Sequence, residues 1–444
     1  MNPERLKTRI RSRAMRLMAS EAFLQSRRRR ARLKRRLSGE TQAVHYFHQV
    51  DDPYSHLAVQ KLDALKATYS PPFKVHLVSG PAAAFQGSTE HFKAWALRDA
   101  RSVAADYGVA FDAEALPQPS SVDQANDRLA PQLDAADFAA QACATGEALW
   151  SGVSQPAESS GKGPEAVRRG DALRERLGHY LGGMFHFEGE WFWGIDRIRL
   201  LEARLMVEGF GGGEPCVPEP VPTDTSGLDA SRIVLEYFPS LRSPYTAVGH
   251  KRVLDLIARS GVTVKLRPVM PMMMRGVEAP RPKQRYILTD AAREARAHGV
   301  PFGRVVDPFG EPVRRAFALF PGAVALGAGM AFVTAYLSAA WAEAIDISTD
   351  AGLRQVAANA GLDWNDLQAA SRDADWSALL DDNLNAMLDA GLWGVPSFRV
   401  TGGADGDAYA CWGQDRIWRV ENEIAKRAQR EGASPSPIPM AESR

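Results

Sequence analysis

Apolar positions in this chain form two similar series, and each series predicts the same order of elements. A short β-branched and aromatic strand comes first, as in YFHQV from Tyr46 and EYFPS from Glu236. A helix, a second strand, a long helical region and a closing hairpin follow. Between Val313 and Ala390, apolar residues recur at spacings of three and four, which is typical of packed helices. The pattern therefore predicts an α/β fold.

The two series also match residue for residue, which indicates a tandem duplication. A constant offset of 191 residues lays YFHQVDDPY on YFPSLRSPY, so Asp52 matches Ser243, and it lays YGVAF on HGVPF. Near the ends, FWGIDRI matches CWGQDRI at an offset of 219, so the second half carries extra, mostly helical residues. Strand, helix, parallel strand, helical insertion and antiparallel hairpin predict two tandem thioredoxin-like domains, each with an inserted helical subdomain.

Glycine and proline mark the predicted boundaries. The stretch from Gly209 to Gly227 is rich in both residues, which cannot propagate a helix, and it reads as a linker between domains. The resulting prediction has five parts: a basic arm at 1–40, a degenerate domain at 41–208, a linker at 209–230, a second domain at 231–430 and a disordered tail at 431–444.

Charge is distributed unevenly along the 444 residues, although the net charge is only +1. Fourteen Lys and Arg lie between Arg5 and Arg36, opposed by Glu4 and Glu21. Such an arm could bind an anionic surface, either lipid or nucleic acid, through residues 1–37. It could equally be a helical extension that docks on its own protein, and the sequence leaves both alternatives open.

Cysteine usage limits the chemistry. The three cysteines, Cys143, Cys216 and Cys411, are too far apart for a CxxC redox pair or a thiolate zinc site. No apolar run approaches the length of a membrane span, and the basic leader lacks the apolar middle of a secretory signal. These observations predict a cytoplasmic protein.

Two turns in the second half are candidates for binding chemistry. Ser243 followed by Pro244 is the combination favoured at the start of a helix, where exposed amides and the helix dipole attract an anion. A thiolate placed there would be stabilised relative to its thiol. In GLWGVPSF, Pro396 lies just before a strand, where a cis peptide bond can turn the backbone towards a ligand. Taken singly, each motif is more often an ordinary helix cap or turn.

Together these motifs resemble the family of 2-hydroxychromene-2-carboxylate isomerases and kappa-class glutathione transferases, within the DsbA-like thioredoxin clan. The resemblance covers nearly all of residues 231–426, and its further matching pieces, in family order, are LRPVMPMMMRG, PRPKQRYILTDAAREARAHGVPF, AAWAEAIDI, AANAGLDW and WGQDRI. It implies a glutathione-binding, cysteine-less domain in which Ser243 is similar to the serine that hydrogen-bonds the glutathione sulfur.

The resemblance also implies roles for other residues. Pro396 is similar to the cis-proline, and the backbone of Val395 would pair with the cysteinyl part of glutathione. Lys283 would meet a terminal carboxylate, while Asp415, beside Gln414, would hold the γ-glutamyl amine. The predicted pocket for the organic substrate is lined by Tyr245, Met272 and Trp393. The methionines of PMMMRG equally suit a core.

The first half keeps the frame and changes the chemistry. Asp52 stands where Ser243 does, and a carboxylate would repel a thiolate. Laying GMFHF on GVPSF places Phe185 at the position of Pro396, which predicts a trans bond there. The cluster of His48, Asp51, Asp52 and His56 invites a metal hypothesis, but its spacing fits no established ligand pattern, so no metal is predicted.

The leading hypothesis is a glutathione-dependent isomerase or transferase that acts on a hydrophobic aromatic or conjugated compound. The sequence does not choose between isomerisation and transfer, because both need the same activated sulfur. A thiol-disulfide oxidoreductase is disfavoured, since no cysteine occupies position 52 or 243. The alternative is a DsbA-like protein without redox cysteines that serves as a non-catalytic binding platform.

Overall fold

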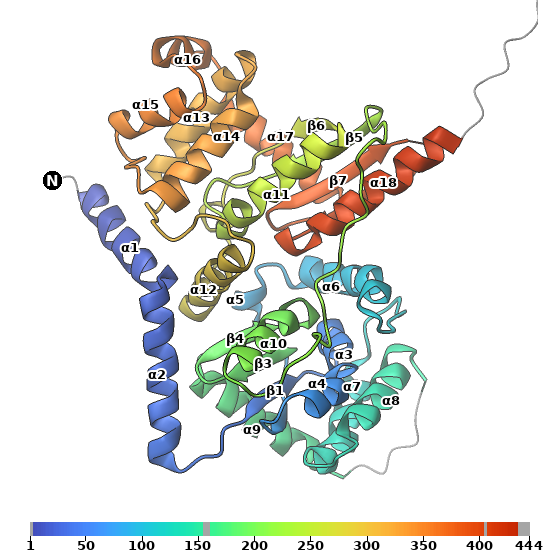
Figure 1. Ribbon diagram of the computed structural model, residues 1–444. Coiled ribbons are helices and arrows are strands. Elements are labelled where there is room, and N and C mark those ends of the chain that lie inside the picture. Colours follow the sequence, from blue (N-terminus) through green and yellow to red (C-terminus); the bar gives the residue numbers. More distant parts are fainter. Residues whose placement is uncertain (1–2, 154–159, 404–405, 434–444) are drawn as a thin grey trace, which may run out of the picture. The chain divides into compact units, whose positions relative to one another are not determined.

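The computed structural model describes residues 3–153, 160–403 and 406–433 and divides into two compact units, whose elements are labelled in Figure 1. The N-terminal unit comprises Ser20–Pro220 and Glu278–Asp290, and the C-terminal unit comprises Met1–Ala19, Val221–Val277 and Ala291–Arg444. Each unit thus combines segments that are distant in sequence. The boundaries expected from the sequence stay predictions, and the tail expected at 431–444 lies almost wholly outside the described residues.

The division between the units falls at two places in the helical part of the chain. Helix α1 (Pro3–Ala19) belongs to the C-terminal unit, whereas α2 (Glu21–Ser38) belongs to the N-terminal unit. Ser20 separates them, and its side chain caps α2 by accepting the N–H of Phe23 at 3.2 Å. Helix α12 (Arg281–Ala297) contributes its first part to the N-terminal unit and the rest to the C-terminal unit.

A four-stranded sheet in the order β2-β1-β3-β4 forms the centre of the N-terminal unit. Strand β1 (Val44–His48) runs parallel to β2 (Phe73–Leu77) and antiparallel to β3 (Met184–Phe187), which pairs with β4 (Glu190–Trp193). The aromatic and β-branched residues of β1 are buried because helices cover the sheet.

Helices of the N-terminal unit pack closely on this sheet. A Cβ added to Gly170 on α9 would lie 1.9 Å from the carbonyl oxygen of Leu77, so this contact with β2 requires glycine. Besides α2, the helices of the unit are α3 (Pro53–Val59), α4 (Leu62–Thr68), α5 (Ala83–Gln86), α6 (Thr89–Val103), α7 (Pro119–Leu129), α8 (Phe138–Trp150), α9 (Gly163–Arg176) and α10 (Ile198–Val207).

The C-terminal unit repeats the same sheet topology in the order β6-β5-β7-β8. Strand β5 (Ile233–Phe238) runs parallel to β6 (Thr263–Leu266) and antiparallel to β7 (Ser397–Gly402), which pairs with β8 (Tyr409–Trp412). The two sheets therefore agree in strand order and in every strand direction. The predicted fold class, two thioredoxin-like α/β domains with helical insertions, is confirmed.

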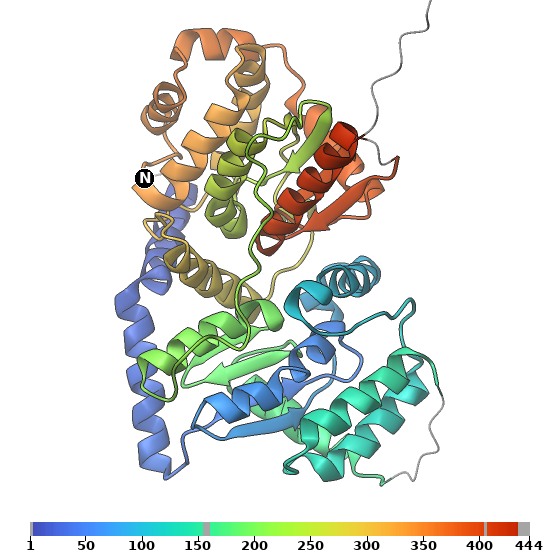
Figure 2. The same ribbon diagram turned by 45° about the vertical axis from the view of Figure 1, so that its right-hand side comes forward.

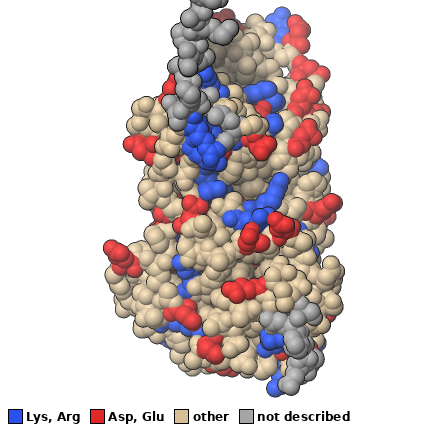
Figure 3. Space-filling view, turned by 90° about the vertical axis from the view of Figure 1, so that its right-hand side faces the viewer, with Lys and Arg blue, Asp and Glu red and all other residues tan. Residues whose placement is uncertain are grey.

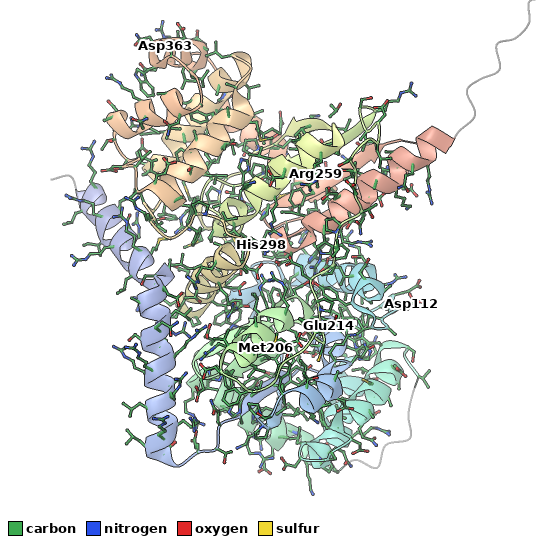
Figure 4. The ribbon with its side chains drawn as sticks, viewed as in Figure 1. Asp112, Met206, Glu214, Arg259, His298 and Asp363 are labelled. Atoms are coloured by element: carbon green, nitrogen blue, oxygen red, sulfur yellow. The ribbon has the colours of Figure 1, made fainter. Side chains whose placement is uncertain are left out.

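The long helical region after α12 forms a layer beside this sheet, orange in Figures 1 and 2. Arg259 lies near the end of α11 (Pro244–Ser260) and is labelled in Figure 4. It forms a salt bridge with Glu421 on α18 (Ile417–Ala433), with an N–O distance of 2.9 Å. The further helices are α11 (Pro244–Ser260), α13 (Glu311–Ala325), α14 (Gly329–Ser338), α15 (Asp350–Asn359), α16 (Trp364–Ser371), α17 (Trp376–Asp389) and α18 (Ile417–Ala433). Within the described residues, every helix is too short or too polar to cross a membrane.

The basic residues of α1 bind the C-terminal unit. Arg11 donates from Nε to the carboxylate of Asp307 at 2.7 Å, and the side chain of Asp307 is fully buried. Ser12 accepts the backbone N–H of Asp307 at 2.9 Å, and Arg16 donates to the carbonyl of Val305 at 2.7 Å. Some of the basic side chains of the arm therefore form ion pairs and hydrogen bonds inside this unit.

The basic residues of α2 bind the N-terminal unit in a similar way. Arg28 pairs with Glu190 at 2.6 Å and Arg35 pairs with Glu188 at 2.8 Å, and both carboxylates are buried. These contacts agree with the docking alternative. On the face seen in Figure 3, basic and acidic side chains are interspersed. Binding of lipid or nucleic acid by residues 1–37 stays a prediction.

Replacing Arg35 with alanine is expected to lower the free energy of unfolding of the N-terminal unit by about 1–3 kcal/mol, because the buried carboxylate of Glu188 loses a charged donor. Urea denaturation followed by circular dichroism measures the change. Arg36→Ala is the matched control, because Arg36 is exposed on the same turn of α2. Equal effects of the two substitutions would contradict the structural role assigned to Arg35.

Candidate functional site

The start of α11 forms the centre of the candidate site. Ser243 caps this helix, and its Oγ accepts the backbone N–H of Thr246 at 3.1 Å. The turn from β5 is closed by a hydrogen bond from the N–H of Ser243 to the carbonyl of Ser240 at 3.0 Å. Pro244 occupies the first helical position, where no N–H is needed. The half-buried hydroxyl of Ser243 thus lies at the positive end of a 17-residue helix.

The loop before β7 brings the second predicted motif to the same place. The peptide bond between Val395 and Pro396 is cis, and the carbonyl oxygen of Val395 accepts a hydrogen bond from Ser243 Oγ at 3.4 Å. The carbonyl oxygen of Pro396 accepts the N–H of Gly413 at 2.9 Å. Ser243, Val395 and Pro396 are therefore neighbours, although about 150 residues separate the serine from the proline loop.

A fixed cation lies beside this centre. Arg242, one residue before Ser243, donates from Nε to the buried carboxylate of Asp307 at 3.1 Å. Its guanidinium group lies 4.7 Å from the ring centroid of Phe309, which holds it further. We did not predict a role for Arg242 from the sequence, although it lies in the motif LRSPY. No local sequence motif indicated a role for its partner Asp307.

Gln414 and Asp415 lie on a 3-10 turn directly after β8. The side-chain amide of Gln414 donates to Glu294 at 3.0 Å and also to Asp415. Arg252 of α11 donates to the side-chain oxygen of Gln414, and to its carbonyl oxygen at 3.2 Å. The buried Gln414 is thus held by an internal network, whereas Asp415 is half-buried.

The predicted substrate-pocket residues have different surroundings. Trp393 is buried, with its ring centroid 5.4 Å from that of Trp412, and its Nε1–H finds no acceptor among the described residues. Tyr245 packs against the buried cluster formed by Val248 and its neighbours on α12. Met272 is half-buried at the start of a 3-10 turn. Their contact with a substrate stays a prediction.

Lys283 belongs to the N-terminal unit rather than to the unit of Ser243. Its Nζ donates to the carbonyl oxygen of Phe85 at 2.7 Å, and burial lowers the pKa of its ammonium group to about 8. Lys283 and the start of α11 therefore belong to different units. Its predicted contact with a ligand carboxylate stays a prediction.

The equivalent turn in the N-terminal unit has a different chemistry. Asp52 caps α3, and its carboxylate accepts the N–H of Ser55 at 2.9 Å and the hydroxyl of Ser55 at 2.8 Å. Burial raises the pKa of Asp52 to about 6, although the bonds from Ser55 oppose this shift. As predicted, Asp52 takes the place of Ser243 at the start of a helix.

The position of Pro396 in this unit is occupied by Gly183, so the alignment that gave Phe185 is wrong by two residues. Tyr46 pairs with Phe185 as Tyr237 pairs with Phe398, and the carbonyl oxygen of Gly183 accepts the N–H of Gly194 at 2.8 Å. Gly183 has a φ of +61°, and a Cβ there would lie 2.9 Å from Asp52 Oδ2. Asp52 therefore fills the space beside this loop.

The cysteines and several histidines lie in buried or half-buried surroundings. All three cysteines are free, and burial raises the pKa of Cys143 to about 11. His48 is bonded to the hydroxyl of Tyr46 at 3.0 Å. Within the described ranges, no group of three His, Cys, Asp or Glu side chains is arranged to hold a metal ion.

Comparison with known proteins identifies the class of the C-terminal unit. Residues 234–425 match the family model described as the DSBA-like thioredoxin domain, slightly less than half of the chain. This stretch is therefore similar to DsbA-like thioredoxin domains. Comparison of the sequence with curated proteins returns no match.

Solved structures with similar folds include two named enzymes. The 2-hydroxychromene-2-carboxylate isomerase is 18% identical with a TM-score of 0.37, and the similarity covers 46% of this chain and 100% of that chain. The cytosolic disulfide reductase DsbM from Pseudomonas aeruginosa is 23% identical with a TM-score of 0.35, covering 44% and 98%. A structure of DsbM with GSH is 20% identical with a TM-score of 0.33, covering 44% and 99%.

Proposed function

We propose that the C-terminal unit binds glutathione and holds its sulfur as a thiolate at the start of α11. The observation that carries this proposal is the position of Ser243 Oγ, 3.4 Å from the carbonyl oxygen of Val395 and at a helix N-terminus. A serine there cannot form a disulfide, but its hydroxyl can donate to an external thiolate. The helix dipole favours the same charge.

The bound thiolate would act on a hydrophobic aromatic or conjugated compound. Reversible addition to a conjugated carbonyl, followed by rotation and elimination, gives an isomerase similar to 2-hydroxychromene-2-carboxylate isomerase. Addition or displacement without elimination gives a glutathione transferase. In either case Trp393 and Met272 would border the organic substrate, and Asp415 would hold the γ-glutamyl amine. A cytoplasmic location belongs to the same proposal.

A thiol-disulfide oxidoreductase is less well supported. Cys411 is buried on β8, and burial raises the pKa values of Cys143 and Cys216, which lowers the fraction of nucleophilic thiolate at neutral pH. A non-catalytic binding platform remains the second candidate. It is favoured by the internal partners of Gln414, which is bonded to Glu294 and Arg252, and by the placement of Lys283 in the other unit.

Replacing Ser243 with alanine is expected to raise the pKa of the bound glutathione thiol by about one unit, because the thiolate loses one charge-assisted hydrogen bond. Thiolate absorbance at 240 nm, followed over pH in the presence of the protein, measures this pKa. Calorimetry with S-methylglutathione is expected to give the same affinity for both proteins, since that ligand has no thiolate.

Ser260→Ala is the matched control, because it makes the same chemical change at the other end of α11, where Ser260 donates to Leu256. Absence of glutathione binding at 10 mM to the unmodified protein would sink the enzyme proposal. Binding without any change in thiol pKa on Ser243→Ala would remove Ser243 from the mechanism.

A further inference from the structure

Exposed apolar side chains are concentrated on the two N-terminal helices. In the described part of the chain, twelve large hydrophobic side chains are exposed, and five of them belong to α1 and α2. Helices of 17 and 18 residues thus carry far more than their share of these side chains. The five are Leu6, Ile10 and Leu17 of α1, and Leu33 and Leu37 of α2. Exposed apolar side chains that gather in this way indicate a binding surface.

Helix α2 has two faces with different roles. One face is docked on its own unit, where Arg28 and Arg35 pair with the buried carboxylates of Glu190 and Glu188. The opposite face is exposed and consists of Arg29, Arg30, Leu33, Lys34, Arg36 and Leu37. Its four cations form no ion pair within the described residues, and no acidic residue follows Glu21 in this helix. This outward face therefore combines free positive charge with two leucines that are 58% and 79% exposed.

Helix α1 is divided in the same way within the C-terminal unit. Its docked face buries Thr8, Ser12 and Ala19, which are each no more than 6% exposed. Leu6, Ile10, Arg13 and Leu17 follow one another at spacings of four, three and four, so they share the other face of the helix. All four of these side chains are exposed. The outward face of α1 is thus an apolar stripe that contains a cation.

This combination of side chains favours lipid over other anionic partners. A helix that lies along a membrane surface places its apolar side chains at the boundary of the acyl chains and its cations among the anionic head groups. The phosphates of a nucleic acid would pair with the cations but would leave the leucines in water. A second copy of the chain would bring two basic faces together, and their like charges would repel.

We propose that the outward faces of α1 and α2 bind the surface of an anionic lipid bilayer. Leu33 and Leu37 of α2, and Leu6, Ile10 and Leu17 of α1, enter the interfacial layer. The neighbouring Lys and Arg contact head-group phosphates and carboxylates. Each helix stays docked on its own unit through its other face, so binding requires no unfolding. The surface is separate from the site of Ser243 and needs no glutathione.

Cosedimentation of the full chain with lipid vesicles tests the proposal. We expect binding to phosphatidylcholine vesicles that contain 30% phosphatidylserine, and binding at least about tenfold weaker to pure phosphatidylcholine. Two double variants remove apolar contacts: Leu33→Gln with Leu37→Gln, and Leu6→Gln with Ile10→Gln. Each is expected to weaken binding to the anionic vesicles about tenfold, because less apolar surface leaves water. Glutamine is chosen because its helix propensity is close to that of leucine.

A third double variant tests the charge of α2. Arg30→Gln with Lys34→Gln is expected to weaken binding to the anionic vesicles at least about tenfold, because two cations near the head groups are lost. Arg168→Gln with Arg169→Gln is the matched control, since both residues are exposed on α9 of the same unit. This control should leave the affinity unchanged. Circular dichroism checks that every variant is folded.

Leu326→Gln with Leu388→Gln is the matched control for the leucine variants, because these two leucines are 44% and 37% exposed outside α1 and α2. It should leave the affinity unchanged. Absence of cosedimentation at 1 mM lipid, or equal binding to the neutral vesicles, would overturn the proposal. Unchanged affinity in either leucine variant would overturn the assignment of that helix. Fluorescence anisotropy with a 30-base-pair DNA duplex tests the competing partner, and tighter binding to the duplex than to the vesicles would also overturn the proposal.

Discussion

Replacing Asp290 with alanine is expected to lower the free energy of unfolding by about 3–5 kcal/mol, because it leaves the buried guanidinium of Arg197 without its carboxylate. The pair lies wholly inside the N-terminal unit, with side-chain exposures of 3% for Arg197 and 0% for Asp290. Three N–O distances between 2.9 and 3.2 Å join the two groups in a fork.

Urea denaturation followed by circular dichroism measures this change. The matched control is Asp255→Ala, which breaks the exposed pair of Lys251 and Asp255 on α11, where the N–O distance is 2.7 Å. That pair is expected to contribute about 0–1 kcal/mol because water screens it. The double variant Arg197→Met with Asp290→Ala should recover part of the stability, since it removes both buried charges. Equal losses for Asp290→Ala and Asp255→Ala would contradict the assigned role.

Lowering the pH from 8 to 5 is expected to unfold the N-terminal unit before the C-terminal unit. Burial lowers the pKa values of six histidines in the N-terminal unit: to about 4 for His45 and His56, to about 3 for His48, His76 and His186, and well below the usual value for His179. In the C-terminal unit, burial lowers the pKa of His250 to about 4. The histidines are therefore concentrated in one unit.

The sign follows from proton binding. The unfolded chain takes up protons near pH 6.5 and the folded chain only near pH 3 to 4, so stability falls as the pH drops through this window. At pH 5 each such histidine lowers the free energy of unfolding by about 2 kcal/mol, or about 6 kcal/mol for the three least exposed that have a defined value, His48, His56 and His186. Asp52 opposes this with about 1 kcal/mol, since its raised pKa lets the folded state bind a proton. The remainder is comparable with the whole stability of a domain.

Thermal melting by circular dichroism at a series of pH values detects the loss, and peptide-resolved hydrogen exchange at pH 5 locates it. His186→Gln should flatten the dependence of the melting temperature on pH, because it removes one buried titrating group. His91→Gln should not, because His91 is exposed on α6. Protection of the N-terminal sheet at pH 5 equal to that of the C-terminal sheet would contradict this prediction.

Local patterns in the sequence were sufficient to predict the sheets and the two helix starts. The constant offset placed Asp52 and Ser243 correctly, because both lie between a buried strand and a helix that starts with proline. The same method missed the equivalence of Gly183 and Pro396. A shift of two residues keeps every side chain of a strand on its own face, so the apolar pattern cannot detect it. Strand pairing and the bonds to Gly194 and Gly413 were needed.

Contacts between distant segments were beyond the reach of the sequence. Nothing near Lys283 indicates that the first part of α12 folds with the N-terminal unit, because its apolar positions continue through the helix without a break. The buried carboxylates that pair with α1 and α2 lie more than 150 residues from their arginines. The histidines of the N-terminal unit are scattered over 142 positions, from His45 to His186, and the sheet brings His45, His76 and His186 together.

Because α12 belongs partly to each unit, it limits where the chain can be divided into fragments that fold. A fragment that starts at Val221 would contain Ser243, the loop at Pro396 and all of α12. Its residues 278–290, however, would lack the rest of the N-terminal unit, to which they belong. Tyr286, which packs with Phe47 and Trp191, would become exposed apolar surface, and Asp290 would lose Arg197. Conversely, a fragment that stops at Pro220 would leave a hole in its own core. Separation of the two halves by proteolysis or cloning should therefore yield two aggregation-prone, poorly soluble fragments.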